Sequence, residues 1–222
     1  MSDSSPVATD VSPVIVAIDG PAGAGKSTVG RAVAARLGLQ YLDTGAMYRA
    51  VTFAALRRGI DPTDETDVAS LAAAIEMTLD GTAVIVDGVD ATVEIRGREV
   101  TAAVSAVAAN SRVRAELVRR QRSWVAEHGG GVVEGRDIGS VVFPDATLKL
   151  YVTASPRVRA ERRVAEIGGN VDDVEASIIE RDRKDSTRAD SPLMESSGAI
   201  VVDTTGSSVD EVVDHVLGLM PA

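Results

Sequence analysis

A glycine-rich turn near the N-terminus constrains this chain more than any other feature. Residues 20–27 are Gly-Pro-Ala-Gly-Ala-Gly-Lys-Ser, which match the pattern G-x-x-x-x-G-K-[ST]. Glycines let the backbone wrap closely, so that successive N–H groups converge on a phosphate, and a following helix adds its positive N-terminal end. The apolar run Val14 to Ile18 precedes the turn, and an amphipathic helix is expected from Ser27 to Leu37. The context therefore predicts a P-loop that binds a nucleoside triphosphate.

Two residues of the loop have an expected part in holding the triphosphate. Lys26 is expected to place a positive charge between the β- and γ-phosphates, and the Ser27 hydroxyl can ligate Mg²⁺ as the cofactor. The predicted ATP-binding residues are Gly20, Pro21, Ala22, Gly23, Ala24, Gly25, Lys26, Ser27 and Thr28. The loop identifies the kind of ligand, but it does not identify the reaction.

The remainder of the chain alternates short apolar strands with helices. Strands are expected at residues 14–18, 39–42, 131–133, 148–152 and 200–202. One helix is expected to begin at Thr44, which can cap it, and another region is expected to be helical across residues 100–127 with a break near 110–111. Further helices are expected from Ser155-Pro156 and over 171–184. The last helix is expected after the capping box of Ser208 and Glu211. Strands separated by helices predict an α/β fold, a doubly wound parallel sheet of five strands.

Residues 61–98 interrupt this alternation. Asp-Gly pairs at 80–81 and 87–88 separate short alternating runs, a pattern typical of β-hairpins. We therefore expect a small antiparallel insertion in the parallel fold. Residues 1–12 show no hydrophobic period and are expected to form a disordered tail.

Composition excludes several classes of protein. The chain of 222 residues is 45% hydrophobic and 25% charged, which argues against wholesale disorder, and its net charge of −10 argues against general nucleic-acid binding. It has no cysteine, and no basic residue precedes Lys26, so neither disulfides nor a signal peptide is expected. The longest charge-free apolar stretch, 100–111, is shorter than the roughly 20 residues that cross a membrane. We expect a cytoplasmic protein without a membrane partner.

Most of the basic residues are arginine, which accounts for 20 of the 23. Arginine presents a planar fork that matches phosphate, and many of these residues gather in 112–122 and 157–163. Solvated helix faces and a local pocket for a small polyanion both explain such clusters.

Other nucleotide-dependent and catalytic classes fit less well. A GTPase needs an N-K-x-D segment, which neither Asn110 nor Asn170 begins, and Asp203 to Gly206 is better explained as a strand end and turn. The segment Leu42 to Ala46 matches an aspartic protease signature, but a helix is expected after it. The two histidines, His128 and His215, are interpreted as structural. A phosphate acceptor suits this chain because it is already anionic and needs no general base.

Four segments together resemble one family. GPAGAGKST, YLDTGAMYRA, EGRDIGSVVFPDA, and IIERDRKDSTR followed by SPL occur in the order seen in bacterial cytidylate kinases, which are nucleoside monophosphate kinases. The resemblance spans about Val14 to Met220. It implies one P-loop kinase domain over 13–222, with 61–98 as the monophosphate-binding insertion and about 155–190 as a short helical lid. It also implies transfer of the γ-phosphoryl group of ATP to CMP or dCMP.

The resemblance assigns roles to individual residues around CMP. It places Thr44, Tyr48, Arg49 and Arg136 at the acceptor phosphate, Ser105, Arg114 and Asp137 at the cytosine edge, and Asp185 and Arg188 at the sugar. A carboxylate at Asp137 can accept from the cytosine N4 amine, whereas uracil presents an acceptor there, so the site would reject UMP.

Further roles concern the transferred group. The resemblance implies that Arg181 reaches the phosphoryl group and that Arg159 and Arg163 lie near ATP, while Arg162 is equally consistent with a solvated neighbour. It gives Glu134 no role and leaves Arg119, Arg120 and Arg122 as a solvated face. Another small kinase, such as a shikimate or different nucleotide kinase, and a nucleotide-dependent switch without catalysis stay open as alternatives. We expect a monomer.

Overall fold

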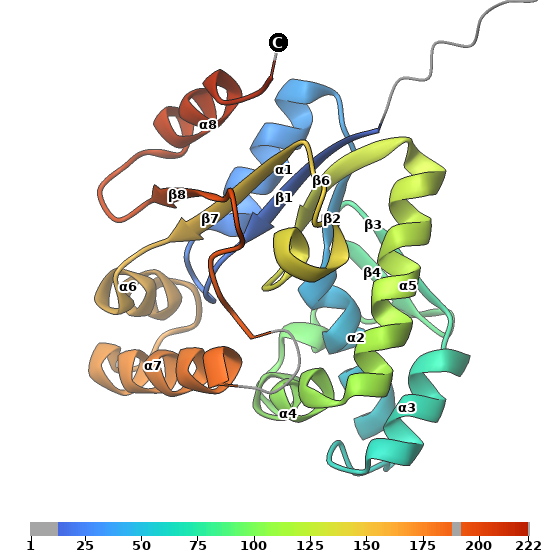
Figure 1. Cartoon of the computed structure of the whole chain (residues 1–222). Helices are drawn as coiled ribbons and strands as arrows, with labels where there is room; N and C mark the ends of the chain where they lie inside the picture. Colours follow the sequence, from blue (N-terminus) through green and yellow to red (C-terminus); the bar gives the residue numbers. More distant parts are fainter. Residues whose placement is uncertain (1–12, 188–191, 222) are drawn as a thin grey trace, which may run out of the picture.

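A five-stranded parallel sheet forms the centre of the computed structural model, which describes residues 13–187 and 192–221 (Figure 1). The strand order is β2-β6-β1-β7-β8, and every neighbouring pair is parallel. The strands are β1 Val14–Asp19, β2 Tyr41–Asp43, β6 Gly130–Glu134, β7 Leu148–Thr153 and β8 Ile200–Asp203. The predicted fold class and its five strands are confirmed. The expected tail and Arg188 lie outside the described residues.

The central strand shows why the sheet is covered on both faces. Along β1, Val16 and Ile18 belong to one buried cluster and Ala17 belongs to the other. The first cluster includes Val29 of α1 and Val212 of α8, and the second includes side chains of α2 and α5. The helices are α1 Lys26–Leu37, α2 Thr44–Arg57, α3 Glu65–Ala74, α4 Arg98–Ala109, α5 Ser111–His128, α6 Pro156–Ile167, α7 Val171–Thr187 and α8 Val209–Gly218. Burial on both faces explains why the strand sequence is continuously apolar.

The predicted hairpins form a separate small sheet. Strands β3 Met77–Asp80, β4 Ala83–Val86 and β5 Val89–Asp90 pair antiparallel around the two Asp-Gly turns. Gly81 and Gly88 have φ values of +56° and +75°, which glycine adopts without strain. The acidic, alanine-rich stretch before this sheet forms α3, a helix that the sequence analysis did not predict, and η1 Glu94–Arg96 and the π-helical turn η2 Ile138–Val142 were also missed.

Helix caps agree with the sequence except at α2. Asp43, rather than Thr44, is the N-cap residue of α2, because its Oδ1 accepts from the Ala46 N–H at 2.9 Å. Asn110 divides α4 from α5 by accepting from the first amides of α5, and Ser208 and Glu211 form the predicted capping box. The cap at Asp43 leaves the Thr44 hydroxyl free for a different contact.

Arg120 of α5 is half-buried, which contradicts the expectation of a solvated face, whereas Arg119 and Arg122 are exposed. Arg120 donates to the carbonyl oxygens of Ala72, Ala73 and Ile75, and therefore satisfies the C-terminal end of α3. Arg122 donates to the carbonyl oxygens of residues 141 and 142. Arg119 is exposed and pairs with Glu116 on its own helix, as expected. None of the helices in the described ranges is long and apolar enough to cross a membrane.

Candidate active site

The P-loop, residues 20–25, connects β1 to α1 in a shape that requires glycine. Gly20 has a φ of +142°, and a Cβ there would lie 1.9 Å from the carbonyl oxygen of Val152. Gly25 is left-handed and precedes α1 without any side-chain cap. The first amides of α1 are therefore left for an anion at the helix N-terminus.

Lys26 lies across the loop that it follows. It is 8% exposed, and its Nζ donates to the carbonyl oxygen of Pro21 at 2.8 Å. Burial lowers the pKa of Lys26, and the positive charge of Arg136 lowers it further. A bound triphosphate would compensate both effects.

Ser27 contacts a buried acid at the end of β6. Its hydroxyl donates to Glu134 Oε1 at 2.7 Å, while Glu134 Oε2 is buried without a hydrogen-bond partner among the described residues. Burial, and next the negative charge of Asp43, raise the pKa of Glu134. The sequence analysis gave Glu134 no role, although an acid that ends an apolar strand beside the P-loop was the available signal.

A cation could be held only by a sparse set of ligands here. The described residues contain no group of three or more His, Cys, Asp or Glu side chains placed to hold a metal ion. Ser27 and the free oxygen of Glu134 nevertheless fit Mg²⁺, which prefers oxygen ligands and keeps several waters.

The first acceptor residues lie at the start of α2. Thr44 donates its hydroxyl to the backbone oxygen of Glu134 at 2.7 Å, which ties α2 to β6. Arg49 pairs with Asp43 through Nη2 and Oδ2 at 2.7 Å, so its guanidinium is turned toward the carboxyl ends of β2 and β6. The Tyr48 ring lies 5.8 Å from the guanidinium carbon of Arg114.

The residues expected at the cytosine edge meet in a buried ion pair. Arg114 of α5 and Asp137, which precedes η2, form a hydrogen-bonded pair whose side chains are 6% and 8% exposed. Ser105 is half-buried on α4, a helix that packs against α2 and α7. The structure thus brings Arg114, Asp137 and Tyr48 together and places Ser105 on a neighbouring helix.

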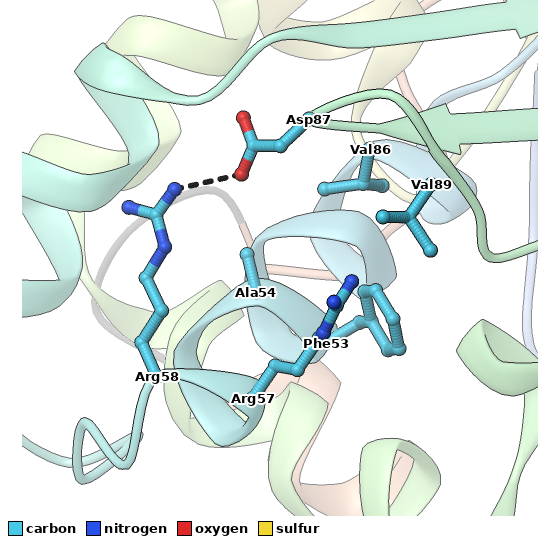
Figure 2. A pocket seen from close by; sticks show the side chains of 7 residues that line it. All are labelled: Phe53, Ala54, Arg57, Arg58, Val86, Asp87 and Val89. Carbon is cyan, nitrogen blue, oxygen red and sulfur yellow. Dashed lines mark hydrogen bonds and ion pairs between the residues drawn. The ribbon is translucent and has the colours of Figure 1, made fainter.

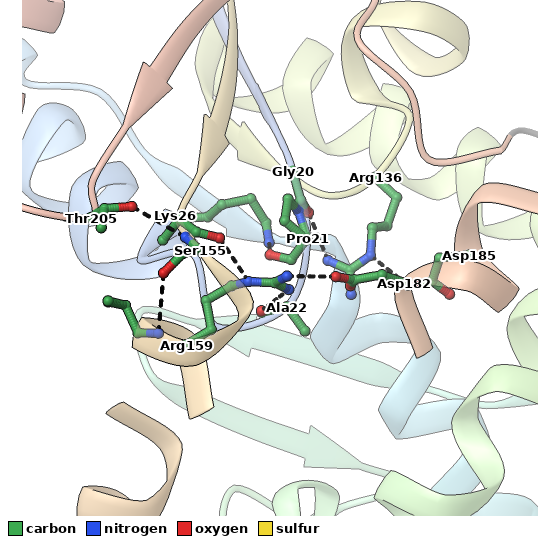
Figure 3. A network of polar contacts seen from close by, with 12 residues as sticks. Gly20, Pro21, Ala22, Lys26, Arg136, Ser155, Arg159, Asp182, Asp185 and Thr205 are labelled. Atoms are coloured by element: carbon green, nitrogen blue, oxygen red, sulfur yellow. Dashed lines mark hydrogen bonds and ion pairs between the residues drawn. The ribbon is translucent and has the colours of Figure 1, made fainter. Parts of the chain in front are cut away.

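Arg136 and Arg181 add positive charge beside the P-loop. Arg136 donates to the carbonyl oxygen of Gly20 at 2.9 Å and pairs with Asp185 at 2.8 Å (Figure 3). Arg181 of α7 is largely buried, and its Nε has no hydrogen-bond partner in the described part of the chain. Burial lowers the pKa of Arg181 to about 10, and the charge of Arg136 contributes to the same shift. These positive charges favour a phosphate ligand beside the P-loop.

The three arginines of α6 lie in different surroundings. Arg159 is buried, donates to the carbonyl oxygens of Ala22 and Ala154, and pairs with Asp182 of α7 at 2.7 Å (Figure 3). Arg162 bonds the hydroxyl and backbone oxygens of Thr204, whose hydroxyl donates to Ala24. Arg163 pairs with Glu166 on its own helix and is partly exposed. The structure brings Arg159 to the P-loop but does not bring Arg163 there.

Two cavities accompany these residues. One of about 560 Å³ lies beside Pro21 and Arg159, between the ends of β7 and β8 and helix α7. Another, of about 330 Å³, lies between the end of α2 and the antiparallel sheet, where Arg57 stands over the Phe53 ring and Arg58 pairs with Asp87 (Figure 2). None of the predicted site residues within 13–187 lines the second cavity.

Comparison with known proteins agrees with this arrangement. A family model described as "Cytidylate kinase" matches residues 16–222. A cytidylate kinase of Corynebacterium efficiens is 48% identical over 218 residues and covers 94% of this chain and 95% of the relative. This chain belongs to the cytidylate kinase family. A cytidylate kinase of Symbiobacterium thermophilum is 50% identical over 214 residues, covering 92% and 94% of the two chains.

Family membership confirms the resemblance seen in the four sequence segments. It favours a phosphotransferase over a non-catalytic switch, and a cytidylate kinase over a shikimate kinase. A solved structure of an uncharacterized protein from Eubacterium ventriosum is 11% identical, has a TM-score of 0.51, and covers 92% of this chain and 96% of its own. That likeness concerns the fold alone.

Proposed function

We propose that this chain transfers the γ-phosphoryl group of ATP to CMP or dCMP, giving ADP and CDP or dCDP. The observation that carries the proposal is Arg181, a buried guanidinium beside Arg136 and Arg49 whose Nε lacks a partner in the described ranges. A largely buried guanidinium with an unsatisfied N–H group is unfavourable even with the Asp182 and Asp185 carboxylates nearby, and an anionic ligand would reduce that cost. Two phosphate-bearing ligands, one on the P-loop and one at these arginines, would meet at this point.

The P-loop, where ATP is proposed to bind as the phosphoryl donor, supplies backbone amides and the ammonium group of Lys26. The amides of residues 23–28 and the N-terminus of α1 would bind the ATP phosphates, and Lys26 would exchange its bond to Pro21 for phosphate oxygens. Ser27 would hold Mg²⁺ directly, with Glu134 receiving its waters. When bound, the ion would neutralise charge on the phosphates.

The acceptor end supplies arginines and a base-reading carboxylate. Arg49 and Arg136 would hold the CMP phosphate, and Thr44 and Tyr48 would line the same wall. Because this phosphate is already an anion, no general base is needed, and catalysis consists of alignment and charge neutralisation by Arg181 and Arg159. Asp185 and Arg188 are proposed to hold the sugar.

Recognition of cytosine is proposed to use the Arg114–Asp137 pair. Asp137 would accept from the N4 amine, while Arg114 and Ser105 would donate to N3 and O2. Uracil would place a carbonyl oxygen against the Asp137 carboxylate, and two acceptors that face each other in a buried site are unfavourable. Helices α6 and α7, joined at Gly168-Gly169, would form the lid that excludes water.

An acceptor panel tests the proposal. ADP release is measured in a coupled assay with CMP, dCMP, UMP, AMP and shikimate at equal concentrations, with and without Mg²⁺. We expect CMP and dCMP to exceed the other acceptors at least about tenfold in kcat/KM. UMP or AMP outrunning CMP would refute the cytosine assignment, and ADP release that ignores the acceptor would refute the kinase. Size-exclusion chromatography with light scattering tests the proposed monomer.

A further inference from the structure

The last residue of β1 makes an unusual long-range contact. Asp19 is 2% exposed, and its two carboxylate oxygens accept from the backbone N–H groups of Ile138 and Gly139 at 2.7 and 2.8 Å. These amides lie 119 and 120 positions away in the sequence and begin the turn η2. Asp19 therefore caps η2 from the end of β1, the strand that pairs with β6.

The contact joins the two halves of the proposed site. Asp19 directly precedes Gly20 of the P-loop, and Ile138 directly follows Asp137. Asp137 has φ −147° and ψ 26° and makes no side-chain cap of its own to η2. Together with the bond from Arg136 to the Gly20 carbonyl oxygen, the Asp19 carboxylate fixes residues 136–139 against the start of the P-loop.

We infer that Asp19 is a positioning residue that holds Asp137 at the correct place and angle for reading the acceptor base, and this inference rests on the proposed function. It does not touch the nucleotide itself. Its effect is to set the distance between the P-loop and the carboxylate of Asp137.

The chemistry of the contact requires an acid. Both neighbours are donors, so two acceptor oxygens are needed, and an ionised carboxylate is acceptor-only. Asparagine has nearly the same shape but would turn an NH₂ group toward one of the backbone N–H groups. Burial raises the pKa of Asp19 to about 6, with the negative charge of Asp137 adding to the shift and Lys26 opposing it. A raised pKa means that burying the charged carboxylate costs free energy of folding, so stability alone does not explain an acid at this position.

The opposite side of the same loop is tightly packed. A Cβ at Gly139 would lie 2.7 Å from Ser196 Oγ and 3.2 Å from Lys149 Cδ. The loop is thus held between the Asp19 carboxylate and the segment near Ser196. A substitution on either side is expected to displace Asp137.

The test compares Asp19→Asn with a matched control, Asp64→Asn. The Asp64 carboxylate also accepts from two backbone amides, those of Thr66 and Asp67, but it lies at the start of α3. We expect Asp19→Asn to raise KM for CMP and to lower the CMP-to-UMP ratio of kcat/KM, each about tenfold, which corresponds to one lost buried hydrogen bond. KM for ATP is expected to change less than about twofold, and the control is expected to leave all of these values near wild type.

Two further measurements keep the inference falsifiable. If Asp19→Asn does not fold, Gly139→Ala displaces the loop from its other side and should reproduce the loss of selectivity. Amide hydrogen exchange of Ile138 and Gly139 is expected to accelerate about tenfold in Asp19→Asn, whichever acceptor the enzyme uses. Equal increases in KM for CMP and ATP, an unchanged CMP-to-UMP ratio, or unchanged exchange at these amides would overturn the assignment. Inactivity of the wild-type chain toward CMP would instead refute the proposed function.

Discussion

The P-loop and the arginine-lined acceptor end lie next to each other but are constructed differently. The P-loop is one continuous segment of backbone, and its shape depends on glycines such as Gly20 and Gly25. The acceptor end combines side chains of α2, α5, α7 and the segment after β6. The first needs only local sequence, whereas the second needs the whole fold.

The two ends also differ in how their charges are compensated. Arg49, Arg114 and Arg136 already pair with Asp43, Asp137 and Asp185. Lys26 instead donates to a carbonyl oxygen, that of Pro21. The phosphate of a bound CMP must therefore compete with these carboxylates for the arginines. The phosphates of ATP meet backbone amides and a lysine that form no ion pair of this kind within the described residues. This difference predicts loose, selective acceptor binding and tight, less selective donor binding.

Replacement of Lys26 by alanine is expected to have the largest effect. Loss of the ammonium group should lower kcat about 10⁴-fold with every acceptor, because the donor phosphates lose their main point charge. The coupled ADP assay measures the loss. Lys184→Ala removes a lysine that pairs with Glu180 on the surface of α7 and is the control. Lys26→Ala with near wild-type turnover would contradict the donor assignment.

Arg181→Met should separate activity from stability. We expect kcat to fall about 10³-fold because the transferred group loses a buried cation. The pKa of Arg181 is lowered in the fold to about 10, which means that the charged form is disfavoured by folding. The free energy of unfolding at pH 7 should therefore rise, by about 1 kcal/mol. Urea unfolding measures this change, and Arg183→Met, on the exposed side of α7 and paired with Glu180, is the control.

Asp137→Asn should weaken the use of CMP without weakening the binding of ATP. The kcat/KM for CMP is expected to fall about 100-fold, and the preference over UMP should narrow, because the amide can donate to the uracil oxygen. Arg114 loses its buried partner, so stability should fall by about 3 kcal/mol. Asp145→Asn makes the same chemical change at an exposed position before β7. A parallel loss of ATP affinity would argue against separate donor and acceptor ends.

Glu134→Gln should change the metal requirement. The Mg²⁺ concentration for half-maximal rate is expected to rise about tenfold, because an outer carboxylate that orients bound water is lost. Titration of Mg²⁺ at saturating ATP and CMP measures the shift. Glu127→Gln, an exposed change near the end of α5, is the control. An unchanged Mg²⁺ dependence would assign Glu134 to the structure of the P-loop instead.

The smallest expected effects on kcat come from substitutions of two arginines of α6. Arg159→Lys keeps the charge but loses the fork that reaches Ala22 and Asp182, and kcat should fall about tenfold. Arg163→Ala removes a partly exposed side chain paired with Glu166, and kcat should fall only about twofold. A larger loss at Arg163 than at Arg159 would restore Arg163 as the lid residue that meets ATP.

Much of the fold could be predicted because its signals are local. The P-loop, the parallel strands, the Asp-Gly hairpins and the capping box at Ser208 depend on neighbouring residues. The cap at Asp43 was missed because Thr44 offers an equally suitable hydroxyl, and only the bond from Thr44 to Glu134 distinguishes them. Helix α3 was missed because an acidic, alanine-rich stretch gave no strong apolar period.

The amino-acid sequence by itself determined the phosphate cradle, the alternation of strands and helices, and the family, since contiguous residues carry all three. Only the tertiary structure decided which arginine meets which acid. It showed that Arg120 supports α3, that Arg163 pairs with Glu166 on its own helix, and that Glu134 and Asp19 lie beside the site. The physical reason is that ion pairs and long-range hydrogen bonds depend on distances between segments far apart in the chain, which no local pattern encodes.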